Sequence, residues 1–404
     1  MPWFIPYPSL DPDQREIVDN LANQKYFING FAGTGKSVVL VHKLRKIYED
    51  NPNAKCCIIS FTHALLEMFK LGIEECGLSN RASNEINSCC AKNGQIDFVT
   101  KYKFQENIRS SNPIRYDFIL IDEVQDLCLS DLNNVIRSRT NHIYLGGDDN
   151  QSIYDKDPID KEPTLTPDVI TRVIQPQEKL LVTLWRITPS ILRVAKLIMP
   201  ELEGKLLGTR FGHTRNTDVI LANAQDESEE VKYVFDNALA YAEDIELTAI
   251  LLPLHRWVKD FCKNILELNE VNITQEIQGY LRPNNKNYNE INRIFSENDI
   301  RLEYVGSQAG SFRHAKEHHN VVLMTYHSAK GMDFDNVFIP FLSSSRHEKF
   351  SYFLPKPLMV AITRSNFNLC LSYSGESMAC VDAIRAACVS VDIDTENETD
   401  YLDF

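Results

Sequence analysis

Residues 29–38 read NGFAGTGKSV, a stretch with three glycines, one lysine and little side-chain bulk. Within it, Gly30, Gly35, Lys36 and Ser37 fit the pattern G-x-x-x-x-G-K-[ST], whose glycines let successive backbone N–H groups turn inward around phosphate oxygens. The preceding KYFI reads as a short buried strand, and the following VVLVHKLRKIYED carries apolar residues at helical spacing. The sequence therefore predicts a strand, a phosphate-binding loop and a helix, with a nucleoside triphosphate as the ligand.

Length and composition indicate a globular protein with more than one domain. The 404 residues are enough for two or three cores, and two is the expectation. No stretch approaches the roughly 20 uncharged apolar residues that span a bilayer, and the opening MPWFIPYPSLDPDQ does not read as a secretory signal. A cytoplasmic protein with no membrane partner is therefore expected. The ten cysteines include no C-x-x-C pair, which argues against a zinc site or a disulfide framework.

The charge of the chain limits how it could bind nucleic acid. A formal net charge of −14 argues against a uniformly basic surface, although it leaves room for a narrow basic groove. Part of the acidity lies in residues 391–404, VDIDTENETDYLDF, which carry six carboxylates and no basic side chain. This stretch reads as a disordered tail, which either stays solvated or docks its apolar tip in a partner protein.

Strand-like runs alternate with helical runs along the whole chain, which is typical of parallel sheets covered by helices on both faces. KYFI, CCIISF, DFILI and HIYLG form a first series, and a second series runs from LLVTL to NLCLSY. Proline and polar residues interrupt the pattern at 171–179, where we place the boundary. The predicted fold class is α/β with two units, residues 1–175 and 176–390, and with a small insertion at about 71–112.

Polar side chains follow two strands of the first unit. In FILIDEVQD, Asp122 and Glu123 come directly after four apolar residues, at the sheet edge where α/β proteins bind ligands. Asp122 can hold Mg²⁺ together with Ser37, and Glu123 can orient and deprotonate an attacking water. In YLGGDDNQSIY, the amide of Gln151 can reach the terminal phosphate or that water.

In combination these segments resemble the UvrD/Rep/PcrA-type superfamily 1 (SF1A) helicases, and the resemblance extends over nearly the whole chain. It implies two RecA-like P-loop NTPase domains with an ATP cleft between them, domain 1A at 1–175 and domain 2A at 176–390. GFAGTGKS is similar to motif I of that family, LIDEVQD to motif II and YLGGDDNQSIY to motif III. Lys36, Glu123 and Gln151 would then act in catalysis. The residues expected to cradle the phosphates are Gly30, Ala32, Gly33, Thr34, Gly35, Lys36 and Ser37.

Further nucleotide contacts follow from the resemblance. LDPDQREIV looks like the Q motif, so Gln14 would bond the adenine edge; the alternative is a glutamine on a solvated helix face. TLWRITPSILRVA resembles motif IV, in which Trp185 would stack on the adenine and Arg186 would reach the γ-phosphate. LMVAITRSNFNLCLSY matches motif VI and implies a second γ-phosphate arginine, Arg364. In LMTYHSAKGMDF, similar to motif V, Gly331 would lie at the nucleotide, and Asp333 stands where the family commonly has a ribose-binding glutamate.

The resemblance also implies contacts to single-stranded nucleic acid. SFTHALLEMF occupies the position of motif Ia, so Phe61, Thr62 and His63 would meet the strand, although a capped amphipathic helix explains these residues equally well. Tyr154 and His327 are further candidates for base stacking, worth roughly 1–3 kcal/mol per base. Thr325 in motif V completes the expected set. After QSIY the family continues with a base-stacking tryptophan, whereas this chain reads DKDPID.

The leading hypothesis is an ATP- and Mg²⁺-dependent translocase or helicase that acts on single-stranded nucleic acid, with DNA favoured and movement 3′ to 5′. The segments that would hold accessory domains are short, which indicates a compact member of the family. They favour an alternative, a nucleic-acid-stimulated NTPase that serves as a regulatory or sensing subunit of a repair or anti-phage defence complex. Its protein partner would bind the accessory regions or the acidic tail. An inactive module that keeps only the fold is a third class, disfavoured because every expected phosphate, metal and arginine position is filled.

Overall fold

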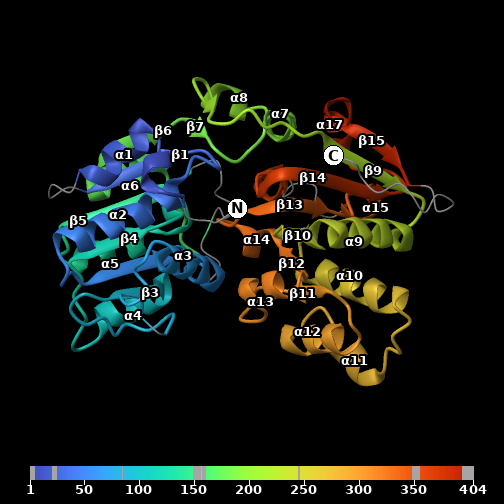
Figure 1. Cartoon of the computed structure of the whole chain (residues 1–404), viewed down its shortest axis with the longest axis horizontal. Coiled ribbons are helices and arrows are strands. Elements are labelled where there is room, and N and C mark those ends of the chain that lie inside the picture. The colour runs from blue at the N-terminus through green and yellow to red at the C-terminus, as the bar shows by residue number, and fades with distance from the viewer. Residues whose placement is uncertain are drawn as a thin grey trace. The chain divides into compact units, whose positions relative to one another are not determined.

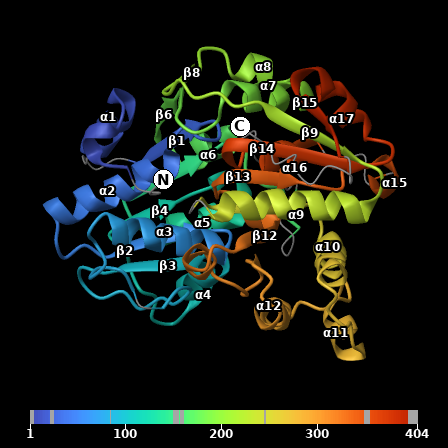
Figure 2. The same ribbon diagram turned by 45° about the vertical axis from the view of Figure 1, so that its right-hand side comes forward.

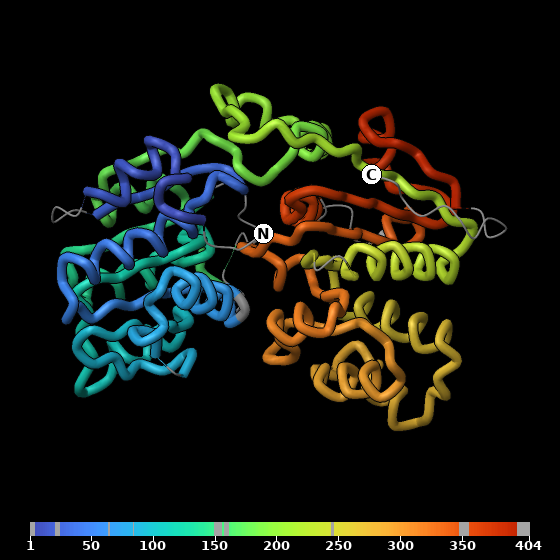
Figure 3. The backbone as a smooth tube through the Cα atoms, in the orientation of Figure 1, coloured from blue at the N-terminus to red at the C-terminus, as the bar shows by residue number. Residues whose placement is uncertain are grey.

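The computed structural model describes most of the chain. The described residues are 5–20, 25–83, 85–148, 156, 161–243, 246–347 and 355–393. Gln151 and Tyr154, both expected at functional positions, lie outside them. The chain forms two compact units. The first contains residues 1–185 and 208–212, and the second contains residues 186–207 and 213–404. The backbone can be followed through each unit in Figure 3.

The first unit is built on a six-stranded sheet in the order β3-β2-β4-β5-β1-β6, in which every pair is parallel. Its strands are β1 (Tyr26–Gly30), β2 (Cys56–Ser60), β3 (Ile96–Thr100), β4 (Phe118–Ile121), β5 (His142–Gly147) and β6 (Gln177–Leu181). A separate two-stranded sheet joins β7 (Thr183–Leu184) to β8 (Arg210–Phe211). Parallel pairing sends the carboxyl ends of β1, β4 and β5 to the same edge.

Helices cover both faces of the first sheet. Successive side chains of each strand point to opposite faces, so apolar residues on both faces need to be covered. The helical elements are η1 (Tyr7–Ser9), α1 (Pro12–Asp19), α2 (Lys36–Asp50), α3 (His63–Glu75), α4 (Lys101–Arg109), η2 (Val124–Asp126), α5 (Leu129–Arg137) and α6 (Pro167–Ile174). Side chains of α1, α2 and α3 share one core with Tyr26, Ile28 and the matching positions of neighbouring strands. The next strand residue, Phe27, points to the opposite face and packs in the core of α4, α5 and α6. Figure 1 labels these helices and most of the strands of the sheet.

Residues 71–112 do not form the expected insertion. They complete α3 and supply β3, the edge strand beside β2, followed by α4, which begins after the N-cap Thr100. Asp97 interrupts the apolar residues of QIDFVT, so the sequence pattern did not indicate this strand. Asp97 is fully buried, and its carboxylate accepts hydrogen bonds from the N–H groups of Cys90 and Ala91 and from the Tyr116 hydroxyl. A buried carboxylate is tolerated here because it is hydrogen-bonded.

The second unit contains a seven-stranded parallel sheet in the order β11-β12-β10-β13-β14-β9-β15. Its strands are β9 (Val219–Ala224), β10 (Thr248–Leu252), β11 (Leu302–Tyr304), β12 (Val321–Thr325), β13 (Phe334–Ile339), β14 (Ser365–Ser374) and β15 (Val389–Asp392). All residues of the central strands β10, β12 and β13 are buried, as expected for a parallel sheet covered on both faces.

Two groups of helices cover the second sheet. The helical elements are α7 (Pro189–Ile198), α8 (Leu202–Lys205), α9 (Glu227–Glu243), α10 (His255–Leu268), α11 (Gln275–Tyr280), α12 (Tyr288–Glu297), α13 (Phe312–Glu317), α14 (Tyr326–Ala329), α15 (Ser344–His347), α16 (Pro355–Ile362), α17 (Ala379–Ile384) and η4 (Arg385–Ala387). Side chains of α9, α10 and α12 share a core with one face of the sheet, and α9 lies along β13 and β14 (Figure 2). Helix α16 packs on the same two strands and contacts α7.

Two expected boundaries differ from the structure. The units divide after Trp185 rather than at 175/176, because β6 pairs with β1 and so belongs to the first sheet. Residues 391 and 392, expected to belong to the tail, instead lie in β15, which pairs with β9. Both strands are sheet edges with mostly exposed side chains, which is why their apolar pattern was weak. Over the part of the chain that the structure describes, we find no helix with the length and apolar character needed to cross a membrane.

Candidate nucleotide site

The phosphate-binding loop joins β1 to α2 at the carboxyl edge of the first sheet. Gly33 and Gly35 have φ angles of 78° and 83°, a left-handed conformation that glycine adopts without strain. Space is also limited at Gly35, where an added Cβ would lie 2.7 Å from Gln14 Nε2. Because Gly35 is the N-cap of the 15-residue helix α2, the loop leads into a helix N-terminus, which favours an anion.

Lys36 folds back over this loop. Its side chain is almost fully buried, and Nζ donates hydrogen bonds to the carbonyl oxygens of Gly30 at 2.8 Å and Phe31 at 3.2 Å. A second loop contact, from Thr34 Oγ1 to the same Phe31 carbonyl at 2.9 Å, closes the turn. The ammonium is therefore held over the loop by neutral acceptors, which a phosphate oxygen would replace with a stronger, charge-assisted one.

Ser37 and Asp122 meet beside the loop. Ser37 Oγ donates to Asp122 Oδ2 at 2.5 Å, so the first turn of α2 is joined to the end of β4. Burial, and then the neighbouring Glu123 carboxylate, raise the pKa of Asp122. Asp122 Oδ1 is buried without a hydrogen-bond partner, and the absence of a side chain at Gly146 leaves it room, since a Cβ there would lie 2.8 Å from this oxygen. An orphaned carboxylate oxygen next to a hydroxyl suits a hard cation such as Mg²⁺.

Glu123 has an unusual backbone conformation, and its carboxylate is hydrogen-bonded to Gln125. Its φ of 53° lies in the left-handed region, which residues other than glycine and asparagine rarely adopt. Residues in such conformations cluster at functional sites. Its carboxylate accepts a short hydrogen bond from Gln125 Nε2. The other end of that amide, Gln125 Oε1, accepts the backbone N–H of Asp148 at 3.1 Å, just beyond β5. Gln125 therefore connects the residue expected to act as base with the segment that leads toward Gln151.

Helix α1 is fixed against the loop through Gln14. The glutamine is 1% exposed, and its side-chain oxygen completes a capping box by accepting the N–H of Asp11 at 3.0 Å. Its side-chain nitrogen donates to Thr34 O, in the loop, at 3.0 Å. It therefore does not lie on a solvated helix face. Lys43 of α2 secures the other end of α1 by donating to the carbonyls of Ile17, at 2.6 Å, and Asn20. Helix α1 is thus tied to the phosphate-binding loop at its N-terminal end and to α2 at its C-terminal end.

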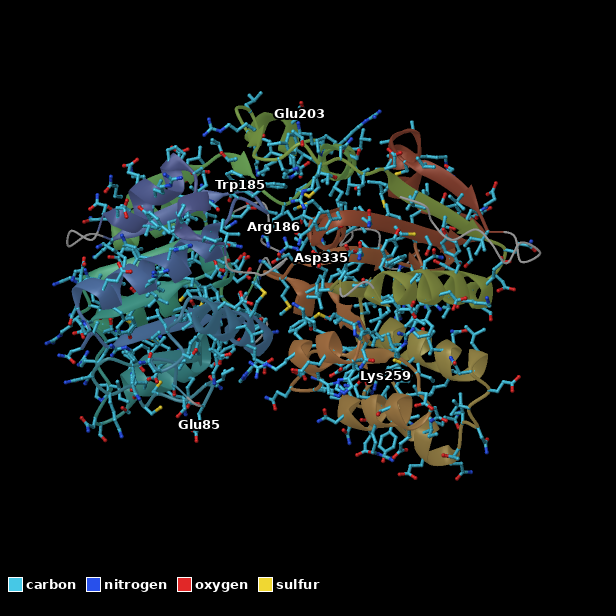
Figure 4. All side chains as sticks on the ribbon, viewed as in Figure 1. Glu85, Trp185, Arg186, Glu203, Lys259 and Asp335 are labelled. Atoms are coloured by element: carbon cyan, nitrogen blue, oxygen red, sulfur yellow. The ribbon has the colours of Figure 1, made fainter. Side chains whose placement is uncertain are left out.

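Trp185 lies in the first unit at the end of β7 (Figure 4). Its backbone N–H donates to the Gly33 carbonyl at 2.9 Å, and its indole Nε1–H donates to Asp11 Oδ2 at 3.3 Å. The structure thus brings Trp185 together with the phosphate-binding loop and with the helix that carries Gln14.

The two predicted arginines and Asp333 lie in the second unit (Figure 4 labels Arg186). Arg186 pairs with Asp333, whose other carboxylate oxygen accepts a hydrogen bond from Asn366 Nδ2 at 3.3 Å. Arg364 is 2% exposed, and its guanidinium donates to the carbonyls of Val360 at 2.9 Å and Met332 at 3.0 Å. Asp333 is therefore the ion-pair partner of one arginine, and both guanidiniums have acceptors within the unit. Gly331 has a φ of 78°, which only glycine adopts freely.

The residues expected to contact nucleic acid fall into two groups. At the end of β2, the Phe61 ring lies 5.3 Å from Nζ of the buried Lys101, and Thr62 caps α3 by accepting the Leu65 N–H at 3.2 Å. Burial lowers the pKa of the next residue, His63. At the end of β12, Thr325 caps α14 by accepting the Ser328 N–H at 3.1 Å.

Burial, and then the positive charges of Lys330 and His255, lower the pKa of His327. Each threonine thus has a structural role, and the strand contacts of both groups stay predictions.

Comparisons with known proteins bear on the fold of the chain and on the segment that holds the phosphate-binding loop. A family model described as AAA domain (AAA_19) matches residues 14–157, which contain the phosphate-binding loop, Asp122 and Glu123. No curated protein matches the chain significantly. Among solved structures, S. cerevisiae Dbp5 bound to RNA and ADP BeF3 is similar over 95% of this chain and 90% of its own, with 10% identity and a TM-score of 0.52. At that identity the likeness shows the fold alone, and it confirms the predicted α/β fold of two RecA-like domains.

Sequence reasoning missed three residues of the first unit that the structure places at the site. Gln125 was visible in LIDEVQD but had no expected role, although it holds Glu123. Asp11 was recognisable as a helix N-cap, and it also bonds Trp185. Gly212 packs against Trp185 from a segment that returns to the first unit after α8, and nothing in the local sequence signals this contact.

Proposed function

We propose that this chain is an ATP-dependent translocase or helicase of the UvrD-like superfamily 1, an enzyme of the cytoplasm that acts on single-stranded DNA and moves 3′ to 5′. The observation that carries the proposal is the arrangement at one sheet edge of Lys36, the Ser37–Asp122 pair and Glu123. A lysine, a metal-binding oxygen pair and a base form the set that nucleoside triphosphate hydrolysis requires.

The proposal gives each residue of the site a role. Lys36 would exchange the loop carbonyls for β- and γ-phosphate oxygens, while Gln14 and Trp185 would hold the adenine. Ser37 Oγ and Asp122 would hold Mg²⁺, which screens the phosphate charge when bound. Glu123 would accept the proton of the attacking water. The remaining residues would complete the site from motifs III to VI: Gln151, Arg186, Arg364, Gly331 and Asp333.

The same proposal explains how hydrolysis would move a strand. If Arg186 and Arg364 reach the γ-phosphate of a nucleotide bound to the first unit, ATP closes a cleft between the two domains and hydrolysis lets it open. Phe61 and Tyr154 in domain 1A and His327 in domain 2A would contact a single strand. The two domains would then bind that strand in alternation as the cleft closes and opens. Contacts to the backbone and to base faces require no sequence reading.

The test is an ATPase assay with and without single-stranded DNA and RNA. We expect Mg²⁺-dependent turnover that single-stranded DNA stimulates more than RNA, and a Glu123→Gln variant that binds ATP but hydrolyses it about 10²–10⁴-fold more slowly. Turnover in Glu123→Gln close to that of the wild type would remove Glu123 from its role. Failure of the wild type to hydrolyse ATP under any of these conditions would overturn the proposal.

A nucleic-acid-stimulated NTPase with little unwinding, serving as a regulatory or sensing subunit, is the second candidate. It is favoured by the division of the described chain into two compact units with no third unit that could engage a duplex. A tailed duplex separates the two candidates. Strand separation coupled to hydrolysis supports the helicase, and stimulated hydrolysis without separation supports the subunit.

A further inference from the structure

The indole of Trp185 is fixed by three separate segments of the first unit. Its own backbone N–H is bonded to Gly33 in the phosphate-binding loop at 2.9 Å, and its Nε1–H is bonded to Asp11 at the start of α1 at 3.3 Å. The third segment is the end of β8, where the Gly212 N–H donates to the Leu184 carbonyl at 2.8 Å. These contacts place Gly212 directly beside the ring.

Gly212 lies over the face of the indole and not beyond its edge. A Cβ built on Gly212 would lie 2.5 Å from Cε3, 2.6 Å from Cζ3 and 2.7 Å from Cδ2 of Trp185. These are three consecutive carbons of the six-membered ring, and nearly equal distances to all three are possible only for a point above the ring plane. The backbone of Gly212 therefore covers one face of the benzo ring, and a planar ligand would have to stack on the opposite face.

The glycine is required here for space and not for backbone conformation. Gly212 is not among the glycines with a positive φ, so its backbone is open to other residues. Ring carbons only 2.5–2.7 Å from a Cβ are closer than real Cβ atoms approach, so any other side chain would displace the indole. A displaced indole would lose its geometry to Asp11, because that bond is already 3.3 Å long.

We infer that Gly212 is a positioning residue for the base of the bound nucleotide, which acts by holding the Trp185 indole in the plane where a purine stacks. The inference rests on the proposed function, since it presumes that the site binds a nucleoside triphosphate. A ring fixed from the loop, from α1 and from β8 loses little freedom when a base stacks on it, and such preorganisation improves affinity. Gly212 would therefore affect recognition of the base and leave recognition of the phosphates unchanged.

This separation of base from phosphate defines the experiment. Binding of ATP, of ADP and of inorganic tripolyphosphate, which has phosphates but no base, is measured by calorimetry for the wild type and for Gly212→Ala. We expect the variant to bind ATP and ADP about 10-fold more weakly, within the range of one base–aromatic stack, and to bind tripolyphosphate like the wild type. Gly204→Ala is the matched control, because an added Cβ there meets no atom within 4 Å.

A second variant serves if Gly212→Ala does not fold. In Asp11→Asn the side-chain oxygen can still accept the Gln14 N–H and cap α1, while the Trp185 Nε1–H loses its carboxylate acceptor. It should weaken ATP binding in the same direction and spare tripolyphosphate.

The outcomes separate this inference from the proposed function. Unchanged ATP binding in Gly212→Ala, or an equal loss of ATP and tripolyphosphate, overturns the inference while the proposed function stands. A wild type that binds none of the three ligands overturns the proposed function.

Discussion

Replacing Asp333 by asparagine tests what the Arg186–Asp333 ion pair does. The substitution keeps the size of the side chain and removes its charge, while an amide oxygen remains to accept the Asn366 hydrogen bond. If Arg186 must leave Asp333 to reach a γ-phosphate, the ion pair competes with ATP. Asp333→Asn should then strengthen ATP binding. A direct ribose contact by Asp333 predicts the opposite sign.

The magnitude follows from the exposure of the pair. The Arg186 side chain is 32% exposed and that of Asp333 is 14% exposed. The exposure of this pair is therefore intermediate between that of a surface ion pair and that of a buried one. Exposed pairs contribute about 0.2–1 kcal/mol, and breaking a fully buried pair costs about 3–5 kcal/mol. An intermediate value of about 1–2 kcal/mol corresponds to a roughly 5- to 30-fold lower Kd for ATP.

Nucleotide binding by isothermal calorimetry, with ADP as the internal control, checks this expectation. ADP has no γ-phosphate, so its Kd should stay within about 2-fold of the wild-type value while that of ATP falls. The gain should also disappear when Arg186→Ala is combined with Asp333→Asn, because the double-mutant cycle isolates the pair. Weaker binding of both ATP and ADP by Asp333→Asn would refute the competition and support the ribose contact.

Further predictions concern the first unit. Lys36→Ala should lose both nucleotide binding and turnover, since Nζ is the cation over the loop; retained ATP binding would exclude that role. Gly146→Ala should lower Mg²⁺-dependent turnover at least 10-fold, because its Cβ would lie 2.8 Å from Asp122 Oδ1, whereas Gly279→Ala, with no atom within 4 Å, should be neutral. Burial lowers the pKa of Lys43 to about 7, so above that pH the unfolded chain holds a proton that the folded chain has released. In urea unfolding, the free energy of unfolding of the wild type minus that of Lys43→Met should therefore rise by on the order of 1 kcal/mol per pH unit between pH 7 and 10. A difference that stays constant over this range would contradict the lowered pKa.

The parts of the fold that could be predicted are those whose signals are local. The loop around Gly35 is specified by its own glycines and lysine, and β4 by four consecutive apolar residues before Asp122. Strands at the sheet edges were missed or assigned to the wrong unit, because solvent or buried polar groups surround part of each strand and weaken its apolar pattern. In β6, Gln177 and Glu178 are exposed. In β3, the buried carboxylate of Asp97 accepts hydrogen bonds from the Cys90 N–H and the Tyr116 hydroxyl.

The sequence indicates which residues belong to the candidate site but not which partners each side chain has. The sequence indicates that Arg364 belongs to a motif, yet its guanidinium is 2% exposed and donates to backbone carbonyls, which depends on how α16 packs. The contact between Gly212 and Trp185 depends on the chain returning to the first unit after α8. Such contacts join segments that are distant in sequence, so no local sequence pattern predicts them.

The acceptors that now hold the three cationic side chains indicate the order in which a nucleotide would engage them. Lys36 is bonded to neutral carbonyls, which are weaker acceptors than a phosphate oxygen, so its exchange is favourable from the start. Arg186 must give up a carboxylate, whereas Arg364, like Lys36, is nearly fully buried and gives up two neutral carbonyls. Exchange at Arg186 therefore yields less free energy than exchange at the lysine. We expect ATP to bind first through the loop and Lys36, with Arg186 engaging in a later, separable step.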